Sequence, residues 1–216
     1  MTQPLRVDII SDVMCPWCIV GYSQLAKAAS DADIDLDVHW HPFELNPQMA
    51  EEGENLREHL AAKYGSTPEQ STQARAQLTN VGQALGFEFN FSDTSQIWNT
   101  FRAHQLLDWA GEQGKGHDLK MALFKAHFTD AKNLSDPDIL ADVAETVGLE
   151  RAEALRLLAS EERAAQVRQK QQFWQHQGIQ GVPAMVFQQR HLVTGAQGEA
   201  NYTNILTQLV EMSSEN

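Results

Sequence analysis

The sequence predicts an α/β protein in which a single β-sheet layer is interrupted by a large, all-helical insertion. Strand patterns occur near both ends of the chain, at 5–11 and 36–42 and again at 182–194. Between about residue 56 and residue 177 the apolar residues recur at helical spacing instead. The predicted order is therefore β-α-β, then the helical block, then β-β-α.

The first β-α-β unit is predicted from three adjoining patterns. Leu5 to Ser11 is nearly all apolar, which is typical of a central strand buried on both faces. From Cys15 the apolar residues recur every three or four positions, and Pro16 suits the first turn of a helix. Residues 36–42 alternate between apolar and polar side chains until Pro42, which predicts a second strand.

The helical block carries two helix-start signals and one unusual segment. Residues 66–69 predict a capping box with proline in the first helical turn, and residues 135–138 show the same pattern. The apolar stripe after the second signal stops at Gly148. Residues 97–110 have no clean polar face, so we expect a helix that is buried on most sides or roofs a cleft.

The last segment predicts a hairpin followed by a helix. Residues 182–187 and 191–194 read as strands joined by a turn at 188–190, and an amphipathic helix follows with Tyr202 and Leu209 on its apolar face. We therefore expect a discontinuous sheet domain at 1–55 and 178–216, with the helical insertion domain at 56–177.

The composition excludes several classes of protein. The 216 residues are 42% hydrophobic, which is typical of a globular protein, and carry 16 Lys and Arg against 29 Asp and Glu, a net charge of −13. This acidity argues against nucleic acid or an anionic membrane as a partner. Residues 1–10 lack a basic stretch followed by an apolar run, and no segment predicts a membrane span. We expect a cytoplasmic protein.

The two cysteines, Cys15 and Cys18, are three positions apart at the predicted strand-to-helix turn. A thiolate at a helix start is stabilised by unpaired N–H groups, so we expect a lowered pKa for Cys15 and assign it as the nucleophile. Cys18, one turn further along the same side, is then the resolving thiol. Pro16 stiffens the turn, and Trp17 forms a bulky apolar lip beside the reactive sulfur.

Two other interpretations give the cysteine pair a structural role instead of a redox role. Free cysteines are often small core residues. A zinc site would need three or four ligands, and His39 and His41, on one face of the second strand, are the remaining candidates. The chain has no second Cys-x-x-Cys motif, so we predict no metal site.

Gly181, Val182 and Pro183 stand at the start of the third strand. An X-Pro bond here is either trans, as at an ordinary strand edge, or cis. A cis bond would turn the backbone N–H and C=O of Val182 outward beside the dithiol, where an extended substrate could pair with them. The residues alone leave both options open.

Six motifs occur together along the chain: 11–14, Cys15–Cys18, Gly21, 40–47, 99–104 and 181–183. In combination they resemble the DsbA family of oxidoreductases, and more closely its cytoplasmic FrnE-like branch, which is related to 2-hydroxychromene-2-carboxylate isomerases and kappa-class glutathione transferases. The resemblance implies a thioredoxin-like core, dithiol-disulfide exchange, and a cis Val182–Pro183 bond facing Cys15. Asn46, Asn99 and His104 match family positions, and we predict that they line the substrate cleft.

The sequence departs from the family in two ways. Periplasmic members have a histidine inside the dithiol motif, where this chain has Trp17, so we expect a weaker oxidant than DsbA. Some FrnE-like proteins carry a second cysteine pair, which this chain lacks, so any reoxidation or reduction of Cys15 and Cys18 must use an external partner. In the related isomerases and transferases a serine occupies the position of Cys15.

Three functions follow as hypotheses. The first is a cytoplasmic thiol-disulfide oxidoreductase or isomerase acting on protein or small-molecule disulfides and thiols, with catalytic Cys15, Cys18 and Pro183, a substrate surface that includes Pro16, Trp17 and Val182, and no required cofactor. The second is a glutathione-dependent isomerase or transferase, with glutathione as reductant or substrate. The third is a non-enzymatic, chaperone-like binding module.

Overall fold

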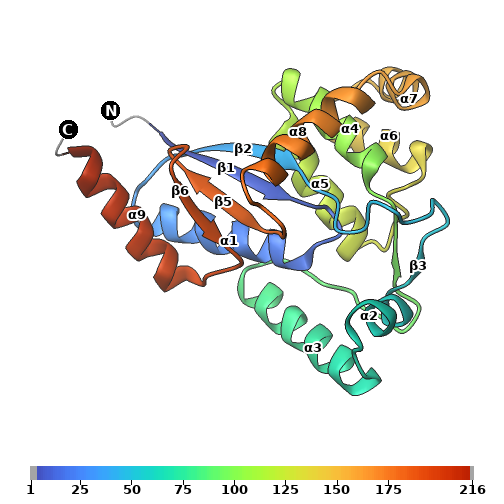
Figure 1. The fold of residues 1–216 in the computed structure, drawn as a ribbon, viewed down its shortest axis with the longest axis horizontal. Helices are drawn as coiled ribbons and strands as arrows, with labels where there is room; N and C mark the ends of the chain where they lie inside the picture. Colours follow the sequence, from blue (N-terminus) through green and yellow to red (C-terminus); the bar gives the residue numbers. More distant parts are fainter. Residues whose placement is uncertain (1–3, 215–216) are drawn as a thin grey trace.

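A four-stranded sheet in the order β2-β1-β5-β6 forms the centre of the fold (Figure 1). The computed structural model describes residues 4–214. β1 (Leu5–Ser11) pairs in parallel with β2 (Leu36–Pro42) and antiparallel with β5 (Ala184–Phe187), and β6 (His191–Thr194) completes the predicted hairpin. The strand that carries the cysteine motif is thus a central one, as its apolar sequence predicts.

Helices cover both faces of this sheet. Val7 and Ile9 of β1 point toward α1 (Pro16–Asp31) and α9 (Glu199–Ser214), where Leu25 and Tyr202 complete one core. Ile10 points to the opposite face and packs with Phe43, Ile179 and Ala184 in a core that Trp174 of α8 partly covers. Alternating side chains of one strand therefore enter two separate cores.

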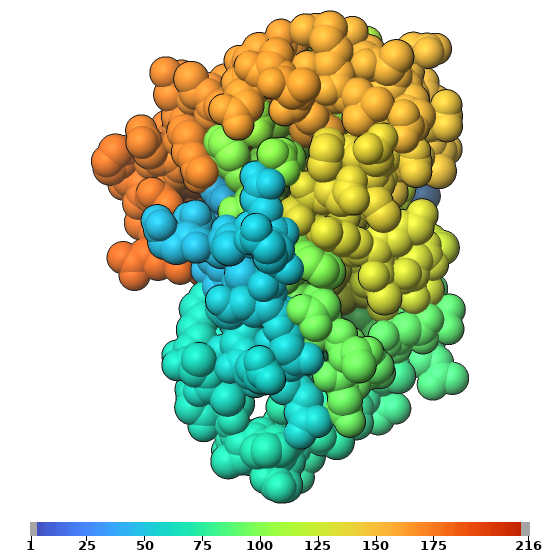
Figure 2. All heavy atoms as spheres, turned by 90° about the vertical axis from the view of Figure 1, so that its right-hand side faces the viewer, coloured from blue at the N-terminus to red at the C-terminus, as the bar shows by residue number. Residues whose placement is uncertain are grey.

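The insertion is helical, with its own core built around leucines such as Leu106, Leu123 and Leu140. Figure 2 shows that this side of the molecule is made almost entirely of insertion segments. In the described chain, the insertion contains these helices: α2 (Leu56–Tyr64), α3 (Pro68–Ala84), α4 (Phe101–Glu112), α5 (Gly116–Phe128), α6 (Pro137–Thr146), α7 (Arg151–Ser160) and α8 (Ala164–His176).

Three local predictions need correction. Residues 97–110 are not one helix: β4 (Gln96–Ile97) pairs with β3 (Glu54–Asn55), and α4 begins at Phe101. The capping box is formed by Thr67 and Gln70 because Pro68 occupies the first helical position, so the box lies one residue later than predicted. The strand predicted from Val182 begins at Ala184.

The predicted class, a mixed α/β sheet with a helical insertion, is confirmed. The domain boundaries at 55/56 and 177/178 stay predictions. Within residues 4–214, no helix is long and apolar enough to span a bilayer. The prediction that residues 1–10 form no basic stretch followed by an apolar run includes residues 1–3, which lie outside the residues that the structure describes.

Candidate active site

The two cysteines lie where β1 leads into α1. Cys15 is the N-cap residue of α1, with Pro16 at the first helical position. The backbone N–H of Cys15 donates to the Asp12 carbonyl at 3.1 Å, and that of Cys18 donates to the Cys15 carbonyl at 3.0 Å. Both side chains are free thiols, with Cys15 4% and Cys18 0% exposed. The dithiol is therefore fixed at a helix start and almost enclosed by protein.

The loop before β5 faces Cys15. The Val182–Pro183 peptide bond is cis, as the resemblance implied, and the Cys15 sulfur lies 3.6 Å from the Val182 carbonyl oxygen. Gly21 of α1 lies against this loop: a Cβ there would be 3.4 Å from both Pro183 Cγ and Met185 Cε. The missing side chain lets the helix that carries the dithiol pack closely on the proline loop.

The two thiols share a hydrogen bond that shifts their pKa values in opposite directions. This bond, together with burial and repulsion from a Cys18 thiolate, raises the pKa of Cys15 well above that of an ordinary thiol. Burial also raises the pKa of Cys18, but hydrogen bonds from Cys15 and Ser11 and the charge of Lys120 outweigh it, so the Cys18 pKa is lowered. The prediction of a lowered pKa at Cys15 is thus wrong for the reduced pair, because Cys15 is the donor.

A buried lysine of the insertion supplies positive charge to this site. Lys120 of α5 is 1% exposed, and its ammonium lies 5.3 Å from the Trp40 ring centre and 5.1 Å from that of Phe124. Burial lowers the pKa of Lys120 to about 8, against the attraction of Cys18, Asp12 and Cys15. Its proton therefore remains largely bound at neutral pH, which favours a thiolate in the pair.

Asp12 anchors the loop that precedes the dithiol. Its carboxylate accepts from the Leu45 N–H at 2.7 Å and lies 3.4 Å from Nε2 of His104. Burial raises the pKa of Asp12, but the hydrogen bond and charge of His104 and the Leu45 N–H outweigh it, so the pKa is lowered. A charged Asp12 beneath the dithiol in turn raises the pKa of Cys15.

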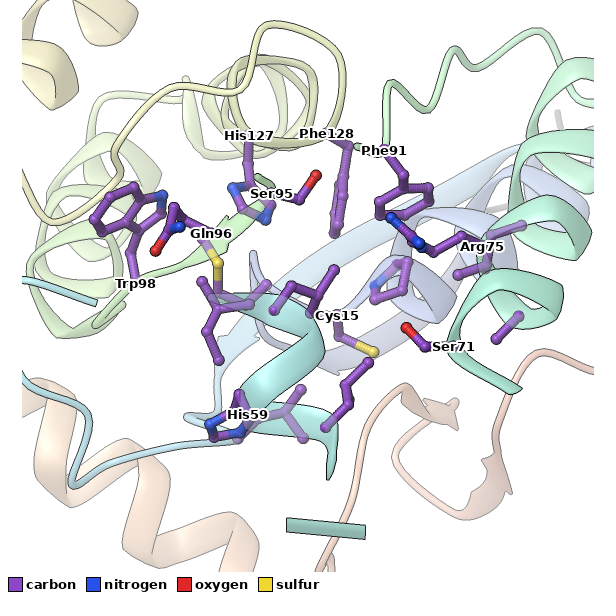
Figure 3. A pocket seen from close by; sticks show the side chains of 18 of the residues that line it. Cys15, His59, Ser71, Arg75, Phe91, Ser95, Gln96, Trp98, His127 and Phe128 are labelled. Carbon is purple, nitrogen blue, oxygen red and sulfur yellow. The ribbon is translucent and has the colours of Figure 1, made fainter. Parts of the chain in front are cut away.

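A cavity of about 490 Å³ opens beside Cys15, between the proline loop and the insertion (Figure 3). Its wall is mainly apolar, with Leu78, Phe91 and Phe128 among the lining residues. Its volume lies within the range of small-molecule binding pockets, roughly 300–1,000 Å³. A substrate in this cavity would have direct access to the outer sulfur of the pair.

Residues 6–207 match the DSBA-like thioredoxin domain family, which covers nearly all of the chain. The chain belongs to this DsbA-like family. The uncharacterized protein YwbO of Bacillus subtilis (strain 168) is 30% identical to this DsbA-like protein over 148 residues, an overlap that spans 68% of each chain. The family relation confirms the thioredoxin-like core and a general oxidoreductase or isomerase character.

Two solved structures show the same fold. A probable DsbA oxidoreductase of Streptomyces coelicolor is 32% identical and superposes with a TM-score of 0.88 over 94% of this chain and 89% of its own. The cytosolic disulfide reductase DsbM of Pseudomonas aeruginosa with GSH is 18% identical, with a TM-score of 0.63 over 96% of this chain and 100% of its own. At that identity the second likeness shows the fold alone.

The structure brings most of the predicted site residues of this DsbA-like protein together. Cys15, Pro16, Trp17, Val182 and Asn46 all line the cavity. Trp17 is 38% exposed, in keeping with its predicted place at the lip. The Asn46 carboxamide oxygen accepts hydrogen bonds from two other residues that line the cavity, Lys63 at 2.6 Å and His59 at 3.2 Å.

Asn99 and His104 lie outside the cavity lining. The Asn99 amide donates to the Met49 carbonyl at 2.8 Å and accepts from the Phe101 N–H at 2.9 Å, so it fixes the turn into α4. His104 is buried beneath the dithiol beside Asp12. Both touch the loops that shape the site, and their role in substrate binding stays a prediction.

The alternative zinc ligands do not converge on the cysteines. His39 pairs with Asp37 at 2.8 Å, and His41 pairs with Asp8 at 2.8 Å on the sheet face opposite α1. Among residues 4–214, no group of three or more His, Cys, Asp or Glu side chains is arranged to hold a metal ion.

Among the polar residues of this site that sequence reasoning missed are Lys120 next to the dithiol, and Ser71, Arg75 and His127 in the cavity wall. All four lie in α3 or α5 of the insertion. Ser71 and Arg75 are four positions apart on one helix face, a spacing that could have suggested a joint role once the helix was predicted.

Proposed function

We propose that this protein is a thiol-disulfide oxidoreductase in which Cys15 is the nucleophile and Cys18 the resolving thiol, acting on disulfides of proteins or small molecules. The proposal rests on one observation above all. The Cys15 sulfur lies at the start of α1, faces the Val182 carbonyl at 3.6 Å and lines the cavity, whereas Cys18 is fully buried behind it.

The hydrogen bond between the thiols indicates how exchange begins. Cys15 transfers its proton to the Cys18 thiolate and attacks one sulfur of a disulfide RS–SR′. The Cys15–S–SR bond forms, the S–S bond of the substrate breaks, and R′S⁻ leaves. Cys18 then passes its proton to that thiolate and attacks the Cys15 sulfur, which releases RS⁻. The substrate has gained two electrons, and the Cys15–Cys18 disulfide has formed.

The reduced pair must be regenerated from outside, because the chain has no further cysteine. We assign this step to a cytoplasmic thiol, with glutathione as the first candidate. Two cations beside the cavity, Lys63 and Arg75, suit its carboxylates, and the DsbM structure of the same fold carries GSH. The protein then needs no resident cofactor: two glutathione thiols supply the two electrons and leave as their disulfide.

Trapping of the mixed disulfide tests the roles of the two thiols. Cys18→Ala, incubated with oxidised glutathione and separately with insulin, should accumulate a Cys15-linked adduct that mass spectrometry detects. Cys15→Ala is the matched control and should accumulate none. In steady state with reduced glutathione, both variants should lose disulfide reduction. Full activity in Cys15→Ala, or an adduct at Cys18 in the wild type, would contradict the proposal.

A further inference from the structure

A second hollow of the molecule lies on the sheet face that points away from α1. A groove of about 610 Å³ runs between α8 and the hairpin of β5 and β6 (Figure 1). Its floor is formed by Arg6 and Asp8 of β1 and by His41 of β2. Within the described chain, no residue that lines this groove also lines the cavity beside Cys15. The groove is therefore spatially separate from the dithiol.

The floor of the groove holds a buried carboxylate in the middle of a central strand. Asp8 is 1% exposed, accepts hydrogen bonds from Arg6 Nε at 3.0 Å and Nη2 at 2.8 Å, and lies 2.8 Å from His41 Nε2. Apolar residues in place of a buried ion pair usually give the same or a higher stability. Stability alone therefore does not explain these charges, whereas ionised groups gathered in a cleft are common at functional sites.

Asp8 fixes the Arg6 guanidinium at the edge of the groove. The two hydrogen bonds to one carboxylate hold the plane of the guanidinium, and Nη1 has no hydrogen-bond partner among residues 4–214. The Arg6 side chain lines the groove and is 39% exposed, so a bound molecule has access to it. A donor that is fixed in this way loses little conformational freedom when it binds a ligand.

The lining of the groove is positive, although the chain as a whole carries a net charge of −13. Arg6, Lys170 and Arg190 line it, and Asp8 is the one carboxylate among the lining residues that the structure describes. The Lys170 ammonium contacts Asp108, a carboxylate that serves a second arginine as well. Arg190 is exposed and makes no side-chain hydrogen bond or ion pair within residues 4–214. Charge complementarity therefore favours an anionic ligand.

The walls of the groove are apolar and partly aromatic. Phe173 of α8 is 55% exposed and Leu192 of β6 is 49% exposed, so both present large apolar surfaces to the solvent. The ring of Trp174 lies 5.0 Å from that of Phe173 and 4.8 Å from that of His41. A flat ring that packs against these side chains removes their apolar surface from water.

The size of the groove favours a small molecule over a protein. Its volume of about 610 Å³ lies within the range of small-molecule sites, roughly 300–1,000 Å³. Fourteen residues line it, whereas a stable protein interface takes about 20–30 residues from each partner.

We propose that this groove is a second binding site, for a small aromatic compound that carries a phosphate or carboxylate group. The ring of the ligand packs against Phe173 and Trp174, and its anionic group is bound by Arg6 and Arg190. Binding there does not require the exchange chemistry at Cys15, since the two sites share no lining residue.

The ligand class is tested first, by calorimetric titration of the wild type. 1-Naphthyl phosphate and 1-naphthoate carry the two anionic groups on the same ring, and at least one of them should bind. 1-Naphthol lacks the charge and inorganic phosphate lacks the ring, so each should bind about tenfold more weakly or not at all. Failure of both naphthalene anions to bind, or equal binding of 1-naphthol, would overturn the proposal.

Two substitutions of exposed side chains test the residues of the groove. Arg190→Gln removes an anion-binding charge and Phe173→Ala removes an aromatic wall, and each should weaken binding about three- to tenfold. Both variants should keep the wild-type thermal midpoint, because the two side chains are exposed. Arg156→Gln, an exposed arginine of α7 that lies outside the groove, is the matched control and should bind as the wild type does. Unchanged affinity in both groove variants would contradict the site.

The indole N–H signals in the NMR spectrum show where the ligand binds. The chain has five tryptophans, of which Trp174 lines the groove and Trp17 and Trp98 line the cavity beside Cys15. Saturation with the naphthalene anion should shift the Trp174 signal, assigned by its loss in Trp174→Phe, and leave the other two in place. Shifts of Trp17 and Trp98 instead would place the ligand in the cavity and refute the second site. Tighter binding of the acidic peptide EEFEE, with a shift of Trp174, would assign the groove to a protein partner and overturn the ligand class.

Discussion

Replacement of Lys120 by methionine should stabilise the protein at neutral pH. The pKa of the buried ammonium falls from 10.5 to about 8, and one pKa unit corresponds to about 1.36 kcal/mol, so the charged form costs roughly 3 kcal/mol in the folded state. Methionine fills a similar volume without charge. It gives up the contacts of the ammonium with the Trp40 and Phe124 rings, worth about 1 kcal/mol together. We expect a net gain of about 2 kcal/mol.

The pH dependence separates this effect from ordinary repacking. A lysine whose folded pKa lies below its unfolded pKa holds fewer protons in the folded state, so the stability of the wild type rises as the pH increases from about 8 to 10.5. Lys120→Met lacks this rise, and its advantage should shrink over the same interval. Urea unfolding of both proteins at pH 7 and pH 10, with the dithiol kept reduced, measures the difference.

The same substitution should impair the chemistry that the charge supports. The charge of Lys120 lowers the pKa of Cys18, so its loss should raise the pH at which the first thiol of the reduced pair ionises. Absorbance of the thiolate near 240 nm follows this titration. A variant that is less stable at pH 7, or whose thiol titration is unchanged, would refute this role of Lys120.

Three further substitutions test the active site, the helix packing in the insertion and the hairpin turn. Asp12→Asn should lower the pKa of Cys15 and destabilise the fold by about 2 kcal/mol at pH 7. The deficit should shrink as the pH falls below 3.8, because the stability that comes from the lowered pKa of Asp12 is complete above the unfolded value of 3.8 and is lost as the pH falls through the lower folded pKa; urea melts over pH 3–7 measure this. Gly82→Ala should lower the free energy of unfolding by about 2 kcal/mol, although alanine has the better helix propensity, because its Cβ would lie 2.4 Å from Phe89 Cδ2. An unchanged thermal midpoint would contradict the close packing at Gly82. Gln189→Gly should instead stabilise the fold by about 0.5–1 kcal/mol and raise the thermal midpoint, because Gln189 has a φ of 58°; a lower midpoint would argue against strain in that turn.

The sequence predicted the sheet and the dithiol well because their signals are local. β1 is apolar over consecutive residues, and its end is marked at once by the cysteine motif and Pro16, so strand, turn and helix follow from one short stretch of chain. The hairpin of β5 and β6 is predicted for the same reason. The family resemblance added the cis bond at Val182–Pro183, which the residues alone could not decide.

The cavity and the buried charge could not be predicted, because they depend on how the insertion folds back on the core. Lys120 lies in an amphipathic stretch where a lysine predicts a solvated side chain, yet α5 places it under the dithiol. His127 and Ser71 are 56 positions apart and meet only across the cavity. The local pattern places Ile97 in a helix because its partner in the two-stranded sheet, Glu54, is remote in sequence.

The connection of β1 to β5 determines when this protein becomes competent during synthesis. β1 leaves the ribosome before its antiparallel partner β5, which follows only after the whole insertion. Until then one edge of the first strand is unpaired, and Cys15 lacks the Val182 carbonyl, 167 positions further along the chain. The nascent dithiol is therefore exposed to any thiol or disulfide in the surroundings, and a chaperone or a reducing compartment would protect it until the last strands arrive.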